Sequence, residues 1–361
     1  MGEGHNATGH ALEEAARETW SGVEVEWVKT LQLMGPGVGP VLRRLYETNV
    51  EHTPWAYEFF YDQTRERRWF AQSSKGVIGA WAGRGLEGPI ASWRPDAIIS
   101  TYPMGTAGLA WLRAHRDLRT PLGAWVSDFA PHPFWVFREM DLTLVMHEVA
   151  VPPAQRLVPG ARVAVSAPPV RRRFRPLPRN DAHRALGLPE DAFVGLISGG
   201  SLGFGDVAAA AGIVLSASRR AVAVVVCGHN VRARRELLRE GDRGGRLRAM
   251  GWVDDMPQLY AAADAVITNA GGATALEALA CGRGVLMYRP IAAHGRANAA
   301  LMAEAELAQV LNHPDELRQV VRDLCDQPER VAGLDRAATA YATQRNLADS
   351  LRALLDAARE R

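Results

Sequence analysis

Short runs of aliphatic and β-branched residues alternate with longer Ala-, Leu- and Arg-rich stretches along most of the chain. The short runs have the length of strands, whereas the longer stretches repeat their apolar positions with helical spacing. This alternation predicts a parallel α/β architecture. In the first half of the chain the predicted strands are 23–28, 97–101, 122–127, 142–146 and 162–166. In the second half they are 193–198, 221–227, 248–253, 265–268, 284–288 and 309–311.

A segment rich in proline and arginine, PVRRRFRPLP at residues 169–178, separates the two series of strands. Proline cannot continue a helix or a central strand, so we interpret this segment as an interdomain linker. We therefore expect a first domain over residues 1–168, a second over 179–335, and a helical tail, 336–361, that packs back on the first. Two Rossmann-like, doubly wound parallel sheets would then face each other across a cleft, where such folds bind ligands.

Composition narrows the class of protein. The chain has 361 residues, enough for two domains, and 42 basic against 40 acidic residues give a net charge of +2. This near balance argues against a nucleic-acid partner. Three scattered cysteines form neither a disulfide framework nor a zinc site, which favours a reducing cytoplasm. No apolar stretch reaches the roughly 18 residues that span a bilayer, so any membrane contact is expected to be peripheral.

Two glycine-rich turns follow predicted strands of the second half. The strand 265–268 runs into the turn NAGG, residues 269–272, and the helix expected after it carries Glu277 one turn in. The strand 193–198 runs into GGSLGFG, residues 199–205, where Ser201 adds a hydroxyl donor. Glycines let backbone amides approach an anion, and the first turn of a helix offers unpaired N–H groups. Either turn alone fits an ordinary strand-to-helix connection, but the two together indicate a diphosphate site.

Other strand ends at the same predicted edge carry polar or turn residues. After the strand at 248–253, the backbone of Val253 is free to meet the edge of a base, whereas Asp254 or Asp255 is expected to cap the next helix. His229 follows the strand at 221–227. It either contacts ligand or, as we favour, caps or fills the turn.

Together these motifs resemble the glycosyltransferase family 28-like group, which contains monogalactosyldiacylglycerol synthase and the N-acetylglucosaminyl transferase that makes lipid II. The resemblance rests on the glycine loop at 199–205, GWVDDM at 251–256, TNAGG at 268–272, EALA at 277–280 and the pair His294 and Asn298. It implies a GT-B fold, a UDP-sugar donor, and inversion at the anomeric carbon without a bound metal or other cofactor.

The resemblance also implies roles for single residues on the donor side. It places Val253 against uracil, Glu277 on the ribose, and Gly272, Ala273 and Thr274 around the diphosphate, beside Gly271 and the loop residues Gly200 and Ser201. The family's hexose-contacting motif is a glutamine followed four residues later by an asparagine. This chain has His294 at the glutamine position and keeps Asn298. The departure leaves the donor hexose open among galactose, glucose and N-acetylglucosamine.

The N-terminal turn GEGHNA at residues 2–7 matches the family's Gly-x-Gly-His turn, which implies His5 as catalytic base. An imidazole titrates near neutral pH and can take a proton from an acceptor hydroxyl. A simple helix cap is the alternative. The strand expected before this turn has no residues ahead of Met1, although it is central in a doubly wound sheet. We therefore expect the natural start to lie upstream, which N-terminal sequencing and intact mass of the native protein would test.

The acceptor side is predicted from the stretch SDFAPHPFW, residues 127–135. It resembles the Asp-Phe-x-x-His-Pro-x-Trp stretch of diacylglycerol-type members, which implies that Asp128 and His132 line the acceptor site; capping of a turn is the alternative for Asp128. Residues 53–70 mix seven aromatic residues with arginines. That mixture suits a membrane interface or a lipid groove, and equally a helical core.

The sequence thus predicts an inverting, metal-independent hexosyltransferase that moves a sugar from a UDP-hexose to an acceptor hydroxyl, with a lipid such as diacylglycerol as the favoured acceptor. Two alternatives remain open at this point. One is a UDP-N-acetylglucosamine 2-epimerase of the same fold, and the other is a non-catalytic nucleotide-sugar-binding subunit. A dinucleotide dehydrogenase is disfavoured because no Gly-x-Gly-x-x-Gly motif is followed by an acidic residue at the required distance.

Overall fold

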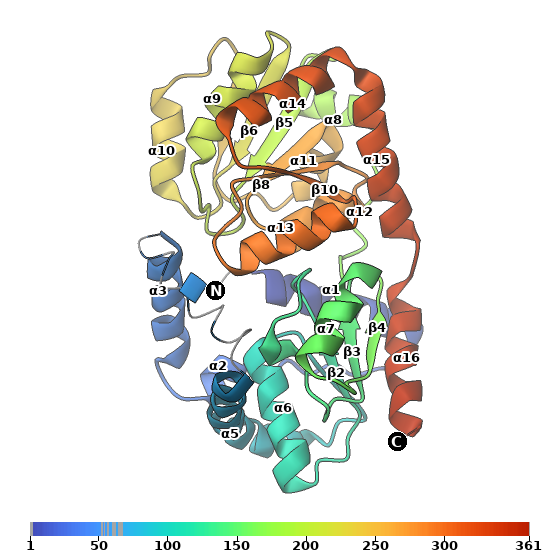
Figure 1. The fold of residues 1–361 in the computed structure, drawn as a ribbon. Helices are drawn as coiled ribbons and strands as arrows, with labels where there is room; N and C mark the ends of the chain where they lie inside the picture. Colours follow the sequence, from blue (N-terminus) through green and yellow to red (C-terminus); the bar gives the residue numbers. More distant parts are fainter. Residues whose placement is uncertain are drawn as a thin grey trace.

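The computed structural model describes residues 3–360 apart from 52, 54, 56–57, 60–62 and 64–67. They form two α/β units, each built on a parallel sheet, and Figure 1 shows one unit above the other. The sheet of the N-terminal unit consists of β1 Ile98–Ser100, β2 Leu122–Trp125, β3 Leu142–Val145 and β4 Val163–Val165, paired in that order. Its helices are α1 Gly4–Thr19, α2 Thr30–Leu33, α3 Val38–Glu51, α5 Arg68–Trp93, α6 Pro103–Arg116 and α7 Val151–Leu157, with short 3-10 turns η1 Pro133–Trp135 and η2 Glu148–Ala150.

The second unit has a six-stranded sheet in the order β10-β9-β8-β5-β6-β7, with all pairs parallel. Its strands are β5 Phe193–Ser198, β6 Ala221–Val226, β7 Leu247–Met250, β8 Ala265–Thr268, β9 Val285–Tyr288 and β10 Ala308–Leu311. Its helices are α8 Arg179–Leu186, α9 Val207–Ala217, α10 Val231–Arg239, α11 Met256–Ala262, α12 Ala273–Ala280, α13 His294–Glu304, α14 Pro314–Asp326 and α15 Pro328–Thr343.

The order of this second sheet fixes where a ligand can bind. The chain starts at β5, moves outward through β6 and β7, and returns to the other side of β5 with β8. Ser198 pairs with Thr268, the last residue of each strand, so the two glycine-rich turns leave the sheet side by side. Such a topological switch point opens a crevice at the carboxyl ends of the strands. The sheet order therefore brings together two turns that are about seventy residues apart in sequence.

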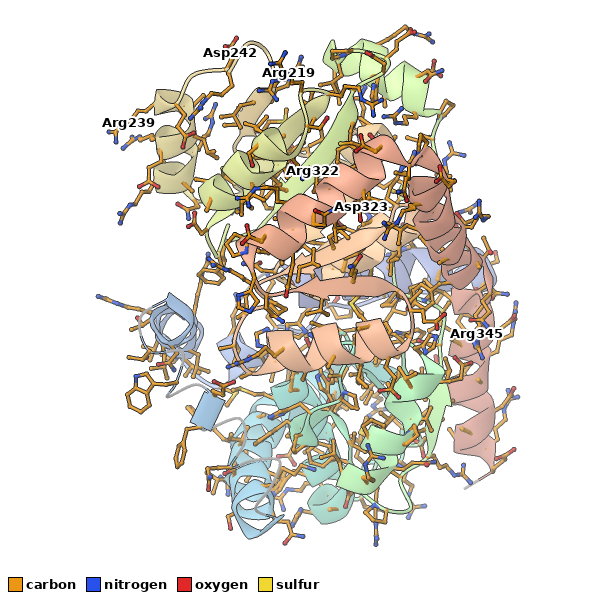
Figure 2. All side chains as sticks on the ribbon, turned by 45° about the horizontal axis from the view of Figure 1, so that its top comes forward. Arg219, Arg239, Asp242, Arg322, Asp323 and Arg345 are labelled. Atoms are coloured by element: carbon orange, nitrogen blue, oxygen red, sulfur yellow. The ribbon has the colours of Figure 1, made fainter. Side chains whose placement is uncertain are left out.

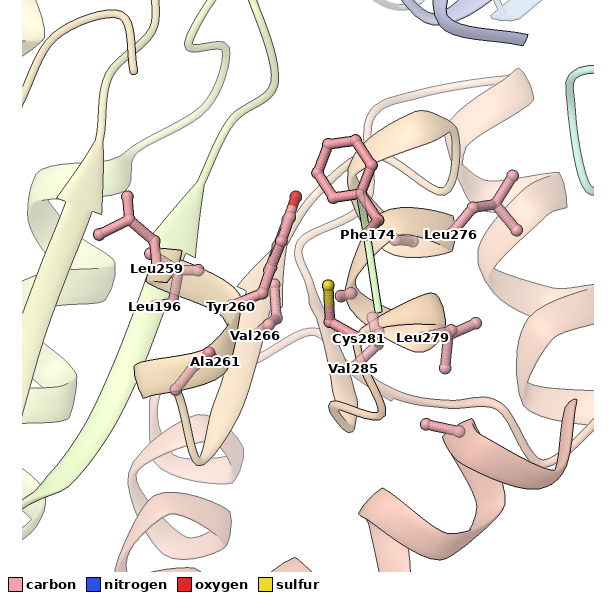
Figure 3. Packing of buried hydrophobic residues seen from close by; sticks show 14 of the residues in the cluster. Phe174, Leu196, Leu259, Tyr260, Ala261, Val266, Leu276, Leu279, Cys281 and Val285 are labelled. Atoms are coloured by element: carbon pink, nitrogen blue, oxygen red, sulfur yellow. The ribbon is translucent and has the colours of Figure 1, made fainter. Parts of the chain in front are cut away.

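Apolar burial holds this edge in place. Every residue of β5, β6, β8 and β9 is buried, as the near-continuous apolar runs of parallel strands require. Figure 3 shows Tyr260 of α11 packed among Leu259, Val266 and Cys281 beneath the start of α12. The floor of the crevice is thus a close-packed core, which positions the turns above it.

The C-terminal helices join the two units. α15 lies on the second unit, and α16, Leu347–Arg359, lies against β2, β3 and α1 of the first (Figure 1). Leu354 packs so closely on β2 that a Cβ on Gly123 would lie 2.6 Å from its Cδ2 atom. Tyr341 donates to the Met146 carbonyl at 3.1 Å, and Arg345, labelled in Figure 2, pairs with Glu148. The domain boundaries expected from the sequence stay a prediction.

Three sequence expectations differ from the structure. Residues 23–28 form no strand: their alternating valines and glutamates suit a pleated surface, but this segment pairs with none of the described strands. The strand expected at 248–253 is β7, Leu247–Met250, which ends earlier because Gly251 begins a turn. The tail is two helices, α15 and α16, since Asn346 caps α16 by accepting from the Asp349 N–H. None of the described helices is both long and apolar enough to cross a bilayer.

Candidate active site in the cleft between the two units

A cavity of about 1010 Å³ opens between the carboxyl ends of the two sheets, with walls from both units. All the candidate site residues from the sequence line it: His5, Asp128, His132, Gly200, Ser201, Val253, Gly271, Gly272, Ala273, Thr274, Glu277, His294 and Asn298. Residues from distant parts of the chain thus meet at one place.

The two glycine turns form the second unit's wall. A Cβ on Gly199 would lie 2.4 Å from the Phe204 carbonyl oxygen, so the loop folds on itself in a way that only glycine permits. Asn269 donates from Nδ2 to the same carbonyl at 2.7 Å and ties the second turn to the first. α12 begins after Gly272, which offers no side chain to cap it. The amides of its first turn therefore face the cleft, together with the positive end of the helix.

Glu277 lies on α12 below this turn. The Tyr260 hydroxyl is 3.2 Å from Glu277 Oε2 and 3.2 Å from the Thr274 carbonyl oxygen. Burial raises the pKa of Glu277 to about 7, although the bond from Tyr260 and the charges of Arg173 and Arg171 oppose the rise. Hydroxyl donors stabilise a carboxylate whose ionisation is made costly by burial.

Three residues of this region were not predicted as site residues. Arg171 and Arg173 line the cleft although they belong to the segment interpreted only as a linker, and Tyr260 closes it from below. The dense run of arginines directly before the second unit was the available signal, since cations there are favourable near an anion. Tyr260 gave no such signal, because its position on α11 reads as ordinary core.

The expected cap of α11 was wrong. Asp255 stands at the N-cap position but accepts no bond with its side chain, whereas Asp254 accepts from Trp252 Nε1 at 2.9 Å. Trp252 stacks on His229 with ring centroids 4.5 Å apart and planes 7° from parallel. Pro257 at the second position of α11 has no N–H, which removes one of the two amides that a cap could satisfy. His229 fills the turn as a stacking partner of Trp252, and Val253 lines the cleft beside them.

His5 faces these turns from α1. Its Nδ1 atom is 2.7 Å from the Ser127 hydroxyl oxygen, and its ring meets Tyr102 edge-on at 5.1 Å. Burial lowers the pKa of His5 below 6.5, and the charge of Asp128 opposes this. The capping alternative does not hold, because Glu3 occupies the N-cap position of α1. The Glu3 N–H also donates to Ser201 Oγ at 3.3 Å across the cleft.

Asp128 and His132 follow β2 on the same side. Asp128 Oδ2 accepts from Trp135 Nε1 at 3.0 Å, which fixes the carboxylate towards the cleft rather than in a cap. His132 Nδ1 accepts from the Phe134 N–H at 3.3 Å and caps η1, and its ring stacks on Phe134. Burial lowers the pKa of His294, and Asp128 again opposes it. The charge of Asp128 thus raises the pKa of one histidine from each unit, His5 and His294, against the effect of burial.

Asn298 connects the units directly. Its Oδ1 accepts from the Ala130 N–H at 2.7 Å, and only 1% of the residue is exposed. A Cβ on Gly271 would lie 2.7 Å from the Asn298 Cβ, so the turn and α13 are in close contact. The residue predicted to contact the sugar therefore also holds the first unit against the donor-side turn.

The residue before His294 is strained. Ala293 has φ +61° and ψ −109°, a region that residues with a Cβ avoid. We expect Ala293→Gly to raise the free energy of unfolding by about 1 kcal/mol, because relief of roughly 1–3 kcal/mol of strain exceeds the added chain entropy. Urea denaturation would measure this. The control Ala300→Gly, inside α13, should lose about 1 kcal/mol; equal losses in both variants would contradict the argument.

Part of the first unit's wall comes from helices that the sequence did not single out. Leu42, Leu45 and Asn49 of α3 and Ile78 of α5 line the cavity. The helical repeat of apolar residues across 38–49 was the available signal. Of the aromatic segment at 53–70, Trp55 and Phe59 are exposed by 72% and 63%, which argues against a core role for these two. Tyr57, Phe60, Tyr61, Arg65 and Arg67 lie outside the described residues.

The geometry so far is that of two parallel-sheet units with two glycine-rich turns on one wall of the cleft between them. The monogalactosyldiacylglycerol synthase family model matches residues 5–170, and the glycosyltransferase family 28 C-terminal domain matches residues 195–351. The UDP-N-acetylglucosamine–N-acetylmuramyl-(pentapeptide) pyrophosphoryl-undecaprenol N-acetylglucosamine transferase of Salinibacter ruber is 30% identical over 71% of each chain. The chain belongs to glycosyltransferase family 28. The family predicted from the sequence motifs is confirmed, and the protein is a glycosyltransferase.

Other family 28 relatives cover more of the chain. The processive diacylglycerol beta-glucosyltransferases of Bacillus pumilus and Bacillus subtilis are each 26% identical, over 92% and 90% of this chain and 86% and 84% of the relatives. Among solved structures, Acinetobacter baumannii MurG aligns with a TM-score of 0.52 at 18% identity, over 76% of this chain and 77% of that one. Anabaena HepE in complex with UDP aligns at 0.51 and 16% identity, over 76% and 80%. The structural likeness confirms the GT-B fold.

Proposed function

We propose that the protein is an inverting, metal-independent hexosyltransferase that moves a sugar from a UDP-hexose to an acceptor hydroxyl. One observation carries the proposal: two glycine turns meet at the switch point of the second sheet, and the candidate base His5 faces them across one cleft. The donor and the acceptor would enter from opposite units. The reaction would take place between them.

The donor is assigned to the second unit. Its diphosphate would accept from the amides at Gly272, Ala273 and Thr274 and from Ser201, while Arg171 and Arg173 add positive charge on the linker side. Its ribose hydroxyls would donate to Glu277. The base would meet the Val253 backbone, and the hexose would extend towards His294 and Asn298.

In the chemical step the acceptor oxygen attacks the anomeric carbon as His5 accepts its proton. The bond from that carbon to the diphosphate oxygen breaks, and UDP leaves with the electron pair on the side opposite the attack, so the configuration inverts. Fixed amides and the positive end of α12 stabilise the charge that develops on the leaving oxygen. No metal ion is needed in this scheme, because preorganised dipoles supply the stabilisation.

The acceptor is proposed to be a lipid such as diacylglycerol. Leu42, Leu45, Ile78, Met104 and Phe134 give the first unit's wall an apolar character beside the polar reaction centre. An amphipathic acceptor would place its hydroxyl near His5 and its chain along these residues. The names of the Bacillus relatives point to the same class of acceptor. Trp55 and Phe59, exposed near α3, would suit peripheral contact with the inner face of the membrane.

The decisive experiment incubates the protein with UDP-glucose, UDP-galactose or UDP-N-acetylglucosamine and either diacylglycerol vesicles or soluble hydroxyl acceptors, with and without EDTA. Mass analysis should find a glycosylated lipid, formed equally in EDTA, and NMR of its anomeric proton should show the inverted configuration. Loss of product in EDTA would remove the metal-free scheme. An epimerised UDP-sugar formed without acceptor would identify a 2-epimerase, and UDP binding without any product would favour a binding subunit.

The raised pKa of Glu277 predicts how donor binding depends on pH. Its ionised form is the better acceptor for two ribose hydroxyls, and that form is populated as pH rises through about 7. UDP-hexose affinity should therefore increase several-fold between about pH 6 and 8, as titration of one group requires. Calorimetry with UDP-glucose would measure it, because its diphosphate does not titrate in this range. In Glu277→Gln the dependence should be flat; an unchanged slope would assign it to another group.

A further inference from the structure

The candidate base His5 also contacts a residue that takes no part in the proposed reaction, Ser127. Ser127 places its hydroxyl oxygen 2.7 Å from His5 Nδ1. Only 6% of Ser127 is exposed, yet the residue lines the cleft, so this bond is shielded by the same walls that hold the substrates. His5 comes from α1 and Ser127 lies two residues after β2, 122 positions apart in the chain. The bond therefore ties the base to the segment that leaves the sheet.

A neutral imidazole has one N–H and one lone pair, and only the nitrogen with the lone pair can act as a base. The bond to Ser127 engages Nδ1, which leaves Nε2 for the acceptor hydroxyl. For Nε2 to accept a proton, Nδ1 must carry the hydrogen and donate it to the Ser127 oxygen. We propose that Ser127 is a positioning residue: its hydroxyl holds Nδ1 of His5 and, in the reactive tautomer, accepts from Nδ1–H, so that Nε2 is directed at the acceptor. This inference rests on the proposed function, since it requires His5 to be the base.

Other neighbours also act on the His5 ring, and the Thr101 backbone accepts a hydrogen bond from it that raises the pKa against the effect of burial. Asp128 commits its Oδ2 atom to Trp135 Nε1 at 3.0 Å and acts on His5 through its charge. Tyr102 meets the imidazole edge-on and Trp135 lies tilted, with centroids at 5.1 and 5.9 Å, so both restrict the ring plane by packing. His294 acts on His5 through space from α13. Among the described side chains, Ser127 is the one with a hydrogen bond to a specified nitrogen of the His5 ring, Nδ1.

The proton movements balance in this arrangement. The acceptor hydroxyl gives its proton to Nε2 as its oxygen bonds to the anomeric carbon, and UDP leaves with the electron pair of the broken bond. His5 becomes an imidazolium with Nδ1–H still donated to Ser127 Oγ. Ser127 neither gains nor loses a proton. A hydroxyl in this place therefore orients the base without adding a second negative charge next to Asp128.

Kinetics of three variants test the role. Ser127→Ala should lower kcat by about 10- to 100-fold, a fraction of the roughly 10²- to 10⁴-fold expected of the base itself, because the ring loses its orientation. UDP affinity should stay unchanged. Ser127→Thr keeps the hydroxyl and should recover most of the turnover. Ser166→Ala is the matched control: it removes an equally buried hydroxyl at the end of β4 that donates to backbone carbonyls, and kcat should not change.

A spectroscopic readout separates tautomer selection from general packing. In protein with ¹⁵N-labelled histidine, at a pH where the imidazole is neutral, His5 should be protonated on Nδ1, and Ser127→Ala should shift it towards the Nε2–H form. An Nε2–H tautomer in the unaltered protein, or full turnover in Ser127→Ala, would overturn the inference. The proposed function fails separately, if His5→Ala keeps its turnover or UDP does not bind.

Discussion

His5→Ala is expected to lower kcat by about 10²- to 10⁴-fold, the range of general base catalysis, while UDP affinity stays close to that of the unaltered protein. The imidazole belongs to the first unit, whereas the amides that would hold the diphosphate belong to the glycine turns of the second. Its pKa is lowered by burial, so it is largely unprotonated and able to accept a proton at neutral pH. The substitution removes an interaction that forms as the proton moves, and a turnover defect without a binding defect follows.

The measurement is steady-state transfer from UDP-hexose, combined with calorimetric titration of UDP on the same preparations. His10→Ala is the matched control, because His10 lies on the same helix, exposed, and its ring packs at a tilt against Trp27 rather than lining the cleft. It should leave kcat unchanged. Partial recovery of His5→Ala by added imidazole would support the base assignment. Unchanged turnover in His5→Ala would mean that another group removes the proton.

Glu277→Ala is expected to weaken UDP-hexose binding by about 10- to 100-fold at pH 8, in line with roughly 1.5–3 kcal/mol for hydrogen bonds to a charged group. Turnover at saturating donor should change much less, because the ribose does not react. The loss should be largest above pH 7, where the carboxylate is ionised in the unaltered protein.

Stability measurements show whether that loss arises from unfolding. The pKa of Glu277 is raised in the folded protein, so its contribution to stability is present below about pH 4.5 and is lost as pH rises through about 7. Replacing it should therefore not lower the melting temperature of the free protein at pH 8. Glu304→Ala, an exposed carboxylate near the end of α13, is the control and should leave binding unchanged. Equal affinity in Glu277→Ala and the unaltered protein would remove Glu277 from the donor site.

The strongest sequence predictions concerned the second unit. The apolar runs at 193–198 and 265–268 coincide with β5 and β8, because a strand buried on both faces has a composition that few other elements share. The glycines after them were informative for a related reason: Gly199 has no room for a Cβ. A backbone position with no room for a Cβ requires glycine, so such a position can be recognised in the sequence.

The weaker predictions depended on partners that sequence does not show. The valines at 23–28 have the period of a strand, but a strand exists only where another pairs with it. Asp254 has the features of a helix cap, yet it bonds Trp252. The sequence indicates a loop residue at Ser127 and a core residue at Tyr260. The structure adds the contact of Ser127 with His5 and that of Tyr260 with Glu277, on which their proposed roles depend.

By itself, the sequence determined the α/β class, the family, the two glycine-rich turns and part of the set of residues that line the cleft, because each has a local signature in period, composition or motif. The tertiary structure decided what those residues do to one another. It set the pKa of Glu277, placed Ser127 on a defined nitrogen of His5, and used Asn298 to join the units. Such properties depend on distances and burial between segments far apart in the chain, which no local pattern encodes.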